Sequence, residues 1–147
     1  MILEILIKPW KKAQADAFLV RQEVFIHEQG VPAELELDEY DPLAAHALAY
    51  LDGRCIGTGR LVDLGGGQAQ IGRMAVLAQF RSTGTGTQIL EKLVQLARSQ
   101  GVQLIILHSQ VAAIPFYEKL GFKVQGLIYD EAGIPHRNMI LLLPNSI

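Results

Sequence analysis

Residues 71–87 read IGRMAVLAQFRSTGTGT, a stretch that runs from the end of an expected strand through a short loop into an expected helix. Within the loop, Arg81, Gly84 and Gly86 form an R-x-x-G-x-G arrangement. Glycine permits positive φ angles and lets the backbone approach a ligand without a Cβ in the way. The first turn of a helix offers unpaired N–H groups and a partial positive charge, so the loop predicts a binding site for a diphosphate.

Two common phosphate-binding motifs do not describe this loop. No Gly-Lys-Ser or Gly-Lys-Thr follows it, so it is not a Walker loop. The elements before it read as hairpins and not as a βαβ unit, so it is not a dinucleotide fingerprint. A glycine-rich turn without a ligand is the simpler alternative, but the strand–loop–helix context favours a phosphate site.

Outward from the loop, hydrophobic periodicity divides the chain into strands and helices. Strands are expected at 2–7, 45–51, 55–62, 68–76, 102–107, 122–129 and 137–143, and helices at 14–25, 87–99 and 112–120. Asp52-Gly53 is a hairpin signal, and the apolar run at 102–107 is typical of a strand covered on both faces. This order predicts an α/β (α+β) fold with a mixed sheet and helices packed on it, in a single domain spanning residues 1–147.

Composition excludes several classes of protein. The 147 residues are 50% hydrophobic, enough for one core, and the net charge of -2 gives no general attraction to nucleic acid or anionic lipid. The single cysteine, Cys55, excludes an internal disulfide and suits a reducing compartment. No apolar run is long enough to span a bilayer, and residues 1–8 alternate like a strand and not like a signal peptide. We therefore expect a cytoplasmic protein.

Charge is uneven in the first half of the chain, where residues 22–53 contain no lysine or arginine. Such a stretch is either a solvated acidic surface, which is the preferred reading, or an acidic mouth that attracts a cationic acceptor. Its acidic residues are Glu23, Glu28, Glu34, Glu36, Asp38, Glu39, Asp41 and Asp52.

Two motifs resemble those of the GNAT (GCN5-related N-acetyltransferase) superfamily. Residues 81–86 match its pyrophosphate-binding motif, and residues 115–122, PFYEKLGF, match its F-Y-x-K-x-G-F helix end. The front segment, with RQEVFIHEQGVP at 21–32, resembles a bacterial branch typified by the ElaA and YjcF proteins. The resemblance implies a mixed, mostly antiparallel sheet of about seven strands, with helices on both faces and a splayed central pair at 68–76 and 102–108.

The resemblance also implies a reaction, the transfer of an acetyl group from acetyl-CoA to an amine. The pantetheine arm of this cosubstrate would pair with the main chain of Met74, Ala75 and Val76, where an N–H would stabilise the oxyanion. Tyr117 would protonate the departing thiolate, although packing on the core is its alternative role. The diphosphate would be held by Arg81, Ser82, Thr83, Gly84, Thr85, Gly86 and Thr87. One departure is that Ser109 or Gln110 stands where many members carry an asparagine that contacts the cofactor.

The acceptor amine must lose a proton before it attacks, so the site needs a base. The candidate bases are Glu28, His46, His108 and His136, and His108 is the best placed, because it follows the apolar strand that would flank the cofactor. Glu28, His46 and His136 are expected to contact the acceptor, and each has an ordinary structural role as its alternative. The four histidines have no ligand-like spacing, so no metal is expected, and Cys55 has no histidine near it in sequence to activate it as a nucleophile.

Two other functions fit parts of the sequence. Residues 21–41, with Glu36-x-Asp38-x-x-Asp41, resemble the front of acyl-homoserine-lactone synthases, but this chain is short and carries both GNAT motifs. A non-catalytic acyl-CoA-binding or regulatory module is the second alternative. Strand edges in small mixed sheets often pair, which also allows a homodimer.

Overall fold

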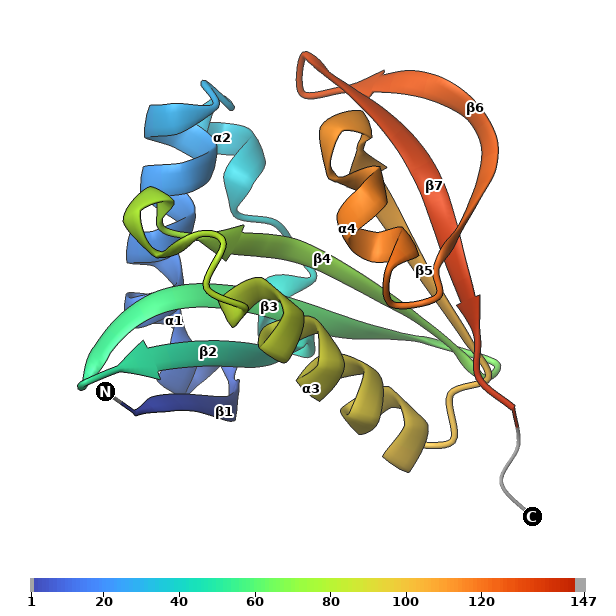
Figure 1. Cartoon of the computed structure of the whole chain (residues 1–147), viewed down its shortest axis with the longest axis horizontal. Coiled ribbons are helices and arrows are strands. Elements are labelled where there is room, and N and C mark those ends of the chain that lie inside the picture. Colours follow the sequence, from blue (N-terminus) through green and yellow to red (C-terminus); the bar gives the residue numbers. More distant parts are fainter. Residues whose placement is uncertain (1, 145–147) are drawn as a thin grey trace.

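The fold is built on one seven-stranded sheet with the order β1-β2-β3-β4-β5-β7-β6 (Figure 1). It is known from a computed structural model, which describes residues 2–144. All neighbouring strands are antiparallel except β4 and β5. The strands are β1 (Leu3–Pro9), β2 (Ala45–Leu51), β3 (Arg54–Gly65), β4 (Gln68–Val76), β5 (Leu104–Gln110), β6 (Lys123–Glu131) and β7 (Ile134–Leu142).

Helices cover both faces of the sheet, as the sequence predicts. The α-helices are α1 (Trp10–Arg21), α2 (Ala33–Glu36), α3 (Thr85–Ser99) and α4 (Ile114–Glu118), and a π-helical segment (Gln22–Glu28) extends α1. Short 3-10 turns lie at Asp41–Leu43, Ala78–Phe80 and Val111–Ala113. Alternate residues of β2 face opposite ways: Leu48 packs with α1, whereas Ala47 and Ala49 join the larger core that includes α3 and α4.

The helix α3 shows why the sequence folds this way locally. Its apolar residues recur every three or four positions, so Ile89, Leu90, Leu93 and Ala97 form one fully buried stripe. That stripe lies close against β3, because a Cβ on Gly59 would be 3.1 Å from both Ile89 and Leu93. Glycine is therefore required in β3 for the helix to reach its packed position.

Several boundaries differ from the sequence prediction, and three of them have a clear local reason. The first helix begins at Trp10 and not at residue 14, because Pro9 ends β1 at the position before it. The fifth strand begins at Leu104 and not at 102, because the N–H of Val102 bonds back to the carbonyl of Ala97 in the capping turn of α3. The last helix is regular only from Ile114, since Pro115 is tolerated in a first turn but not further in.

The central parallel pair is splayed, which confirms the expected fold. Strands β4 and β5 pair only from Gln68–Leu104 to Ile71–Leu107. Beyond this point β4 continues to Val76 beside β3, and β5 continues to Gln110 beside β7. Figure 1 shows the two strands separating, so the sheet opens into a V at its centre.

Within residues 2–144, no helix has the length and apolar character needed to cross a membrane.

Candidate active site

A cleft of about 640 Å³ lies at the opening between β4 and β5. One side is formed by β4 from Gln70 to Val76 and by residues of the front segment between positions 24 and 40. The other side is formed by the ends of β5, β6 and β7, and Tyr117 of α4 also lines it. The cleft thus lies where two halves of the sheet part, a usual position for a ligand site.

The glycine-rich loop leads into the start of α3 beside this cleft. Gly84 has a φ of 87°, and a Cβ there would meet no atom within 4 Å, so glycine is required by the backbone angle and not by lack of space. Helix α3 then begins at Thr85 with no acidic residue in its first turn. Within the described chain no side chain caps this helix start, so its N–H groups and its positive dipole end suit a diphosphate.

Two threonine hydroxyls brace the loop. The hydroxyl of Thr83 donates to the carbonyl of Phe80 at 2.6 Å, and the hydroxyls of Thr83 and Thr85 lie 3.0 Å apart. Ser82 adopts a φ of 65°, which turns the chain sharply before the helix. The loop is therefore held in shape by its own hydrogen bonds.

Arg81 and Glu28 form a bidentate ion pair across the rim of the cleft. The two guanidinium nitrogens of Arg81 lie 2.6 and 2.7 Å from the carboxylate oxygens of Glu28, and Nε donates to the carbonyl of Val76 at 2.9 Å. The hydrogen bond and charge of Arg81 lower the pKa of Glu28. Glu28 is thus tied to the phosphate loop and is not among the residues that line the cleft.

The strand segment Met74–Val76 presents one free main-chain edge to the cleft. Ala75 and Val76 pair with Thr58 and Gly57 of β3 on their other edge. The pairing with β3 shifts by one residue at a bulge, where Arg73 adopts a φ of 51°. The unpaired edge can accept an extended ligand as if it were another strand.

Tyr117 lies in α4 with its ring against Phe116 and Phe122, at centroid distances of 5.0 and 5.9 Å. The residue is 8% exposed and lines the cleft. Burial raises the pKa of Tyr117 to about 12. Its phenol therefore keeps its proton at neutral pH, which is the state that a proton donor needs.

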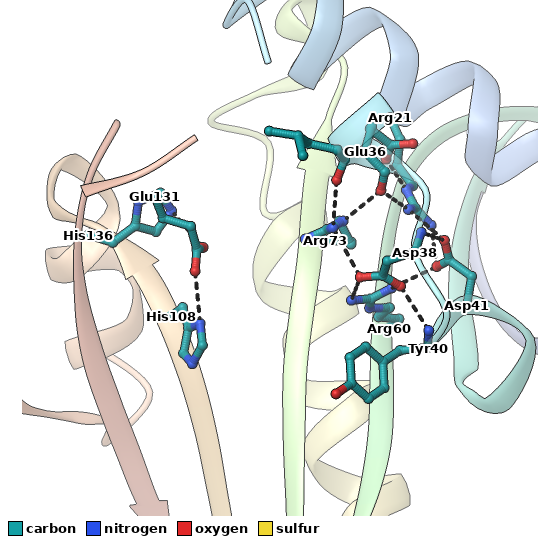
Figure 2. A network of polar contacts seen from close by, with 11 residues as sticks. Arg21, Glu36, Asp38, Tyr40, Asp41, Arg60, Arg73, His108, Glu131 and His136 are labelled. Carbon is teal, nitrogen blue, oxygen red and sulfur yellow. Dashed lines mark hydrogen bonds and ion pairs between the residues drawn. The ribbon is translucent and has the colours of Figure 1, made fainter. Parts of the chain in front are cut away.

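His108 and His136 lie on either side of Glu131, on the wall formed by β5, β6 and β7 (Figure 2). His108 Nδ1 is 3.2 Å from Glu131 Oε1, and His136 Nε2 is 3.5 Å from Glu131 Oε2. All three residues line the cleft. The structure thus brings together two of the predicted histidines and adds a carboxylate that the sequence did not single out.

His46 lies outside this group, on the α1 face of β2. It is 1% exposed, its Nε2 is 2.9 Å from the carbonyl of Asp41, and its ring lies 4.8 Å from the ring of Trp10. Burial lowers its pKa. It is not among the residues that line the cleft.

Ser109 and Gln110 replace the asparagine expected from the family motif. Ser109 is fully buried, and its hydroxyl donates to the carbonyl of Gln110. The side chain of Gln110 reaches across the cleft, where Nε2 donates to Oε1 of Gln29 at 2.9 Å. Of the two, Gln110 is the residue available to a ligand.

The opposite wall of the cleft includes Glu36, Asp38, Arg60 and Arg73, which belong to a network of three arginines and three carboxylates, defined here as the arginine wall (Figure 2). Its members are Arg21, Glu36, Asp38, Asp41, Arg60 and Arg73. Arg21 donates to both Glu36 and Asp41, and Arg60 donates to both Asp38 and Asp41. Burial opposes ionisation of Asp41, but the hydrogen bonds and charges of Arg21 and Arg60 lower its pKa to about 2.

The arginine wall corrects the solvated-surface reading for three of the eight acidic residues, whereas the other five are exposed, namely Glu23, Glu28, Glu34, Glu39 and Asp52. Glu36 and Asp41 are 2% and 1% exposed, so they are not solvated surface. They are neutralised by arginines from α1 and β3, so they do not form an open acidic mouth. The sequence alone did not reveal these ion pairs, because the arginines that form them lie outside residues 22–53.

Glu131 and Arg73 are the cleft residues that sequence reasoning missed. Glu131 precedes the Ala132-Gly133 turn of a hairpin, and strand alternation within that hairpin places it near His136. Its closeness to His108 depends on the pairing of β5 with β7, for which the local sequence carries no signal. Arg73 enters the cleft through a bulge that periodicity does not reveal.

Cys55 is a poor nucleophile in this setting, because burial raises the pKa of its thiol to about 11. Within residues 2–144, no three or more His, Cys, Asp or Glu side chains are grouped so that they could hold a metal ion.

Comparisons with known proteins agree with this architecture. The family model of the acetyltransferase (GNAT) domain matches residues 10–143. The uncharacterized N-acetyltransferase YjcF of Bacillus subtilis is 40% identical over 126 residues, which cover 85% of this chain and 89% of YjcF.

Solved structures share the fold over nearly the whole chain. An acyl-CoA N-acyltransferase from Pseudomonas aeruginosa superposes with a TM-score of 0.84 at 29% identity, covering 95% of this chain and 99% of that one. Escherichia coli ElaA gives the same TM-score and the same coverage of both chains at 23% identity. The acyl-homoserine lactone synthase BjaI is more distant, with a TM-score of 0.79 at 16% identity over 95% of this chain and 82% of BjaI, and it shares the fold alone.

Proposed function

This chain belongs to the GNAT acetyltransferase family, and on that premise we propose that it transfers an acetyl group from acetyl-CoA to an amine by direct attack in a ternary complex. The observation that carries the proposal is the splayed β4–β5 pair beside the uncapped start of α3. The first feature offers a strand edge to an extended arm, and the second offers N–H groups to a diphosphate.

The residues of the chain divide the work of binding. The main chain of Met74, Ala75 and Val76 pairs with the pantetheine arm, along the edge of β4 that faces the cleft. The loop Ser82–Thr87 surrounds the diphosphate with N–H groups, and Arg81 adds charge at the rim, where it is shared with Glu28. The thioester of acetyl-CoA supplies the activated acetyl group.

Proton transfer is assigned to two side chains that line the cleft. His108 takes the proton that the amine loses as its nitrogen bonds to the acetyl carbon, and Tyr117 gives a proton to the sulfur as the carbon–sulfur bond breaks. Tyr117 carries its proton at neutral pH, as a donor must, and its place in the cleft lining supports this role, while burial makes it a weaker acid than an ordinary tyrosine. His136 is assigned to acceptor binding because it lines the cleft, whereas Glu28 and His46 lie outside the cleft lining.

The acceptor is a small-molecule amine or an amine of a peptide or protein. The acyl-homoserine-lactone synthase alternative rests on a resemblance that includes Glu36, Asp38 and Asp41. These three carboxylates form ion pairs with arginines of the arginine wall. A non-catalytic acyl-CoA-binding module is the remaining alternative. A cytoplasmic location and a homodimer stay predictions.

The proposal is tested first by binding and then by turnover. Isothermal titration with acetyl-CoA should give a binding isotherm, and a panel of amines read out by release of the CoA thiol should identify an acceptor. Absence of binding at high micromolar acetyl-CoA would overturn the proposal. Binding without transfer to any amine would favour the non-catalytic module, and transfer that requires S-adenosylmethionine would favour the synthase.

The role of Tyr117 is tested with a matched pair of hydroxyl deletions. Tyr117→Phe should lower kcat about 100-fold, because a positioned general acid contributes a factor of about this size to the rate. The affinity for acetyl-CoA should change little. Tyr50→Phe is the control, because its hydroxyl bonds to Asp16 on the α1 side of the sheet. Equal kcat values for the two variants would remove Tyr117 from the mechanism.

A further inference from the structure

We propose that Glu131 and His136 are positioning residues that hold His108 in the tautomer whose Nε2 accepts a proton in the cleft. The inference rests on the proposed function, and it deepens that function by naming the groups that prepare the base. It depends on strand register, on hydrogen-bond chemistry and on exposure.

Strand register brings the three side chains to one face of the sheet. Gln110 lies opposite His136, and His108 lies opposite Asn138, in the antiparallel pair β5–β7. Tyr129 lies opposite His136 in the pair β6–β7. Directly opposite residues share a face, and residues two apart on a strand do as well, so His108, His136 and Glu131 all project toward the cleft.

The contact with Glu131 fixes which nitrogen of His108 carries the proton. An ionised carboxylate only accepts hydrogen bonds. The Nδ1 of His108, 3.2 Å from Oε1, must therefore be the N–H donor, and the other nitrogen, Nε2, keeps its lone pair in the neutral ring. In Figure 2 the Nδ1 side of His108 faces Glu131, and the rest of its ring points away from that carboxylate.

His136 anchors Glu131 from the second oxygen. Its Nδ1 lies 2.7 Å from the carbonyl of Ile134, and a carbonyl cannot donate, so this nitrogen also carries a proton. Its Nε2 lies 3.5 Å from Oε2 of Glu131, so the protonated ring presents an N–H beside that oxygen. Because His136 is only 7% exposed, it gives the more exposed carboxylate a fixed neighbour.

Exposure separates the roles of the two histidines. The side chain of His108 is 37% exposed and that of His136 is 8% exposed. The proton that passes from the acceptor nitrogen to Nε2 of His108 can therefore leave to solvent from the same ring. His136 is enclosed, with Tyr129 stacked at a centroid distance of 6.1 Å, and suits a fixed support.

Few other charged groups lie near His108, so few could contribute to a change in the pH dependence of kcat. Glu131 and Tyr129 face it from β6 and His136 faces it from β7, while the arginine wall lies across the cleft. Burial raises the pKa of Tyr129, so its phenol stays neutral in the range where a histidine titrates. Glu131 is the one carboxylate that contacts the ring within the part of the chain described.

The first test reads the tautomer directly and needs neither acetyl-CoA nor an acceptor. Long-range proton–nitrogen NMR of the full chain distinguishes Nδ1–H from Nε2–H rings, and four single His→Gln variants assign the signals. His108 should be the Nδ1–H tautomer. His46 is the internal control with the opposite form, because its Nε2 donates to the carbonyl of Asp41. An Nε2–H ring at His108 would overturn the proposal.

The second test asks whether the carboxylate matters to turnover with an amine identified in the acceptor panel. Glu131→Ala should shift His108 toward the Nε2–H tautomer and lower kcat about tenfold or more, with the KM for acetyl-CoA unchanged. The pH profile of kcat in Glu131→Ala should differ from that of the wild type, because His108 loses the one carboxylate that contacts its ring. Glu131→Gln keeps an acceptor oxygen and should retain the tautomer and part of the rate.

The matched control is Glu118→Gln, which removes an exposed carboxylate from α4 and should change neither the tautomer nor the pH profile. If Glu131→Ala leaves kcat and its pH profile intact, the positioning role is wrong even though acetyl transfer stands. If no amine is acetylated, the proposed function fails, and the tautomer measurement still decides whether Glu131 orients His108.

Discussion

The two walls of the cleft carry charge in different ways. The arginine wall contains three guanidinium groups and three carboxylates that bind one another, and Arg21 at its centre is fully buried. The facing wall contains one carboxylate and two imidazoles, whose charge depends on pH, and His108 and Glu131 are exposed to the cleft.

This difference indicates that the arginine wall stabilises the fold and that the facing wall takes part in proton transfer. A guanidinium group stays protonated at any physiological pH, so the arginines can fix a loop but cannot exchange protons. An imidazole with one free nitrogen can accept a proton at neutral pH. We therefore expect substitutions in the arginine wall to act mainly on stability. Substitutions in the facing wall, at His108, Glu131 and His136, should act mainly on the rate of acetyl transfer.

The largest effect is expected at Arg21. Arg21→Ala leaves the buried Glu36 without its arginine and Asp41 with Arg60 alone, and breaking such a buried pair costs about 3–5 kcal/mol of unfolding free energy. Chemical denaturation followed by circular dichroism measures the loss. Arg98→Ala, an exposed change at the end of α3, is the control and should stay within about 0.5 kcal/mol. A loss below about 1 kcal/mol at Arg21 would mean that the network adds little to stability.

A smaller effect is expected from acid. The folded-state pKa of Asp41 is about 2, below its ordinary value of 3.8, so folding favours the ionised form. The contribution is complete above pH 4 and is lost as the pH falls from about 4 to about 2, by about 2 kcal/mol. Unfolding free energies measured across this range should show the loss in the wild type and a weaker dependence in Asp41→Asn. Parallel curves for the two proteins would contradict the assignment.

The edge of the arginine wall should be less sensitive than its centre. Arg73 is part-exposed, and its partner Asp38 is also held by Arg60, so Arg73→Ala should cost about 1 kcal/mol. Arg73→Gly should be more stable than Arg73→Ala by about 1 kcal/mol, because the backbone φ of 51° disfavours any residue with a Cβ. Thermal unfolding of the two variants gives the difference, and equal stability would show that the bulge relaxes.

The smallest effect on stability is expected at His108. His108→Gln removes a side chain that is 37% exposed and contacts one carboxylate, so the unfolding free energy should change by less than about 0.5 kcal/mol. The kcat with an identified amine should nevertheless fall by about 100-fold. Denaturation and thiol-release assays on the same preparation measure both. Loss of stability together with rate would erase the distinction between the two walls.

Much of the fold could be predicted from the sequence, because local patterns decide local structure. The strand and helix order is confirmed, and the bounds of β2 and β4 agree with the periodicity. Among the boundaries that moved, those at Pro9, Val102 and Pro115 did so where a proline or a helix-capping hydrogen bond overrides the hydrophobic pattern. The acidic stretch was misread in part, because the arginines that neutralise three of its carboxylates lie outside it along the chain.

The candidate site likewise contains parts that the sequence predicts and parts that it does not. Residues 81–87 and the strand edge at Met74–Val76 are contiguous segments, so their place beside the cleft follows from motif and element order alone. The position of Glu131 beside His108, 23 residues earlier in the chain, follows from the pairing of β5 with β7. The position of His46 away from the cleft follows from the face of β2 on which it lies.

The sequence by itself determined the order of elements, the glycine-rich turn before α3 and the family, because each depends on residues that are neighbours along the chain. Only the tertiary structure decided which charges meet. Strand pairing and side-chain direction bring distant residues within 3 to 4 Å, and ionic and hydrogen-bonding contacts act only at such distances. That is why the arginine wall and the Glu131 contact became visible only in three dimensions.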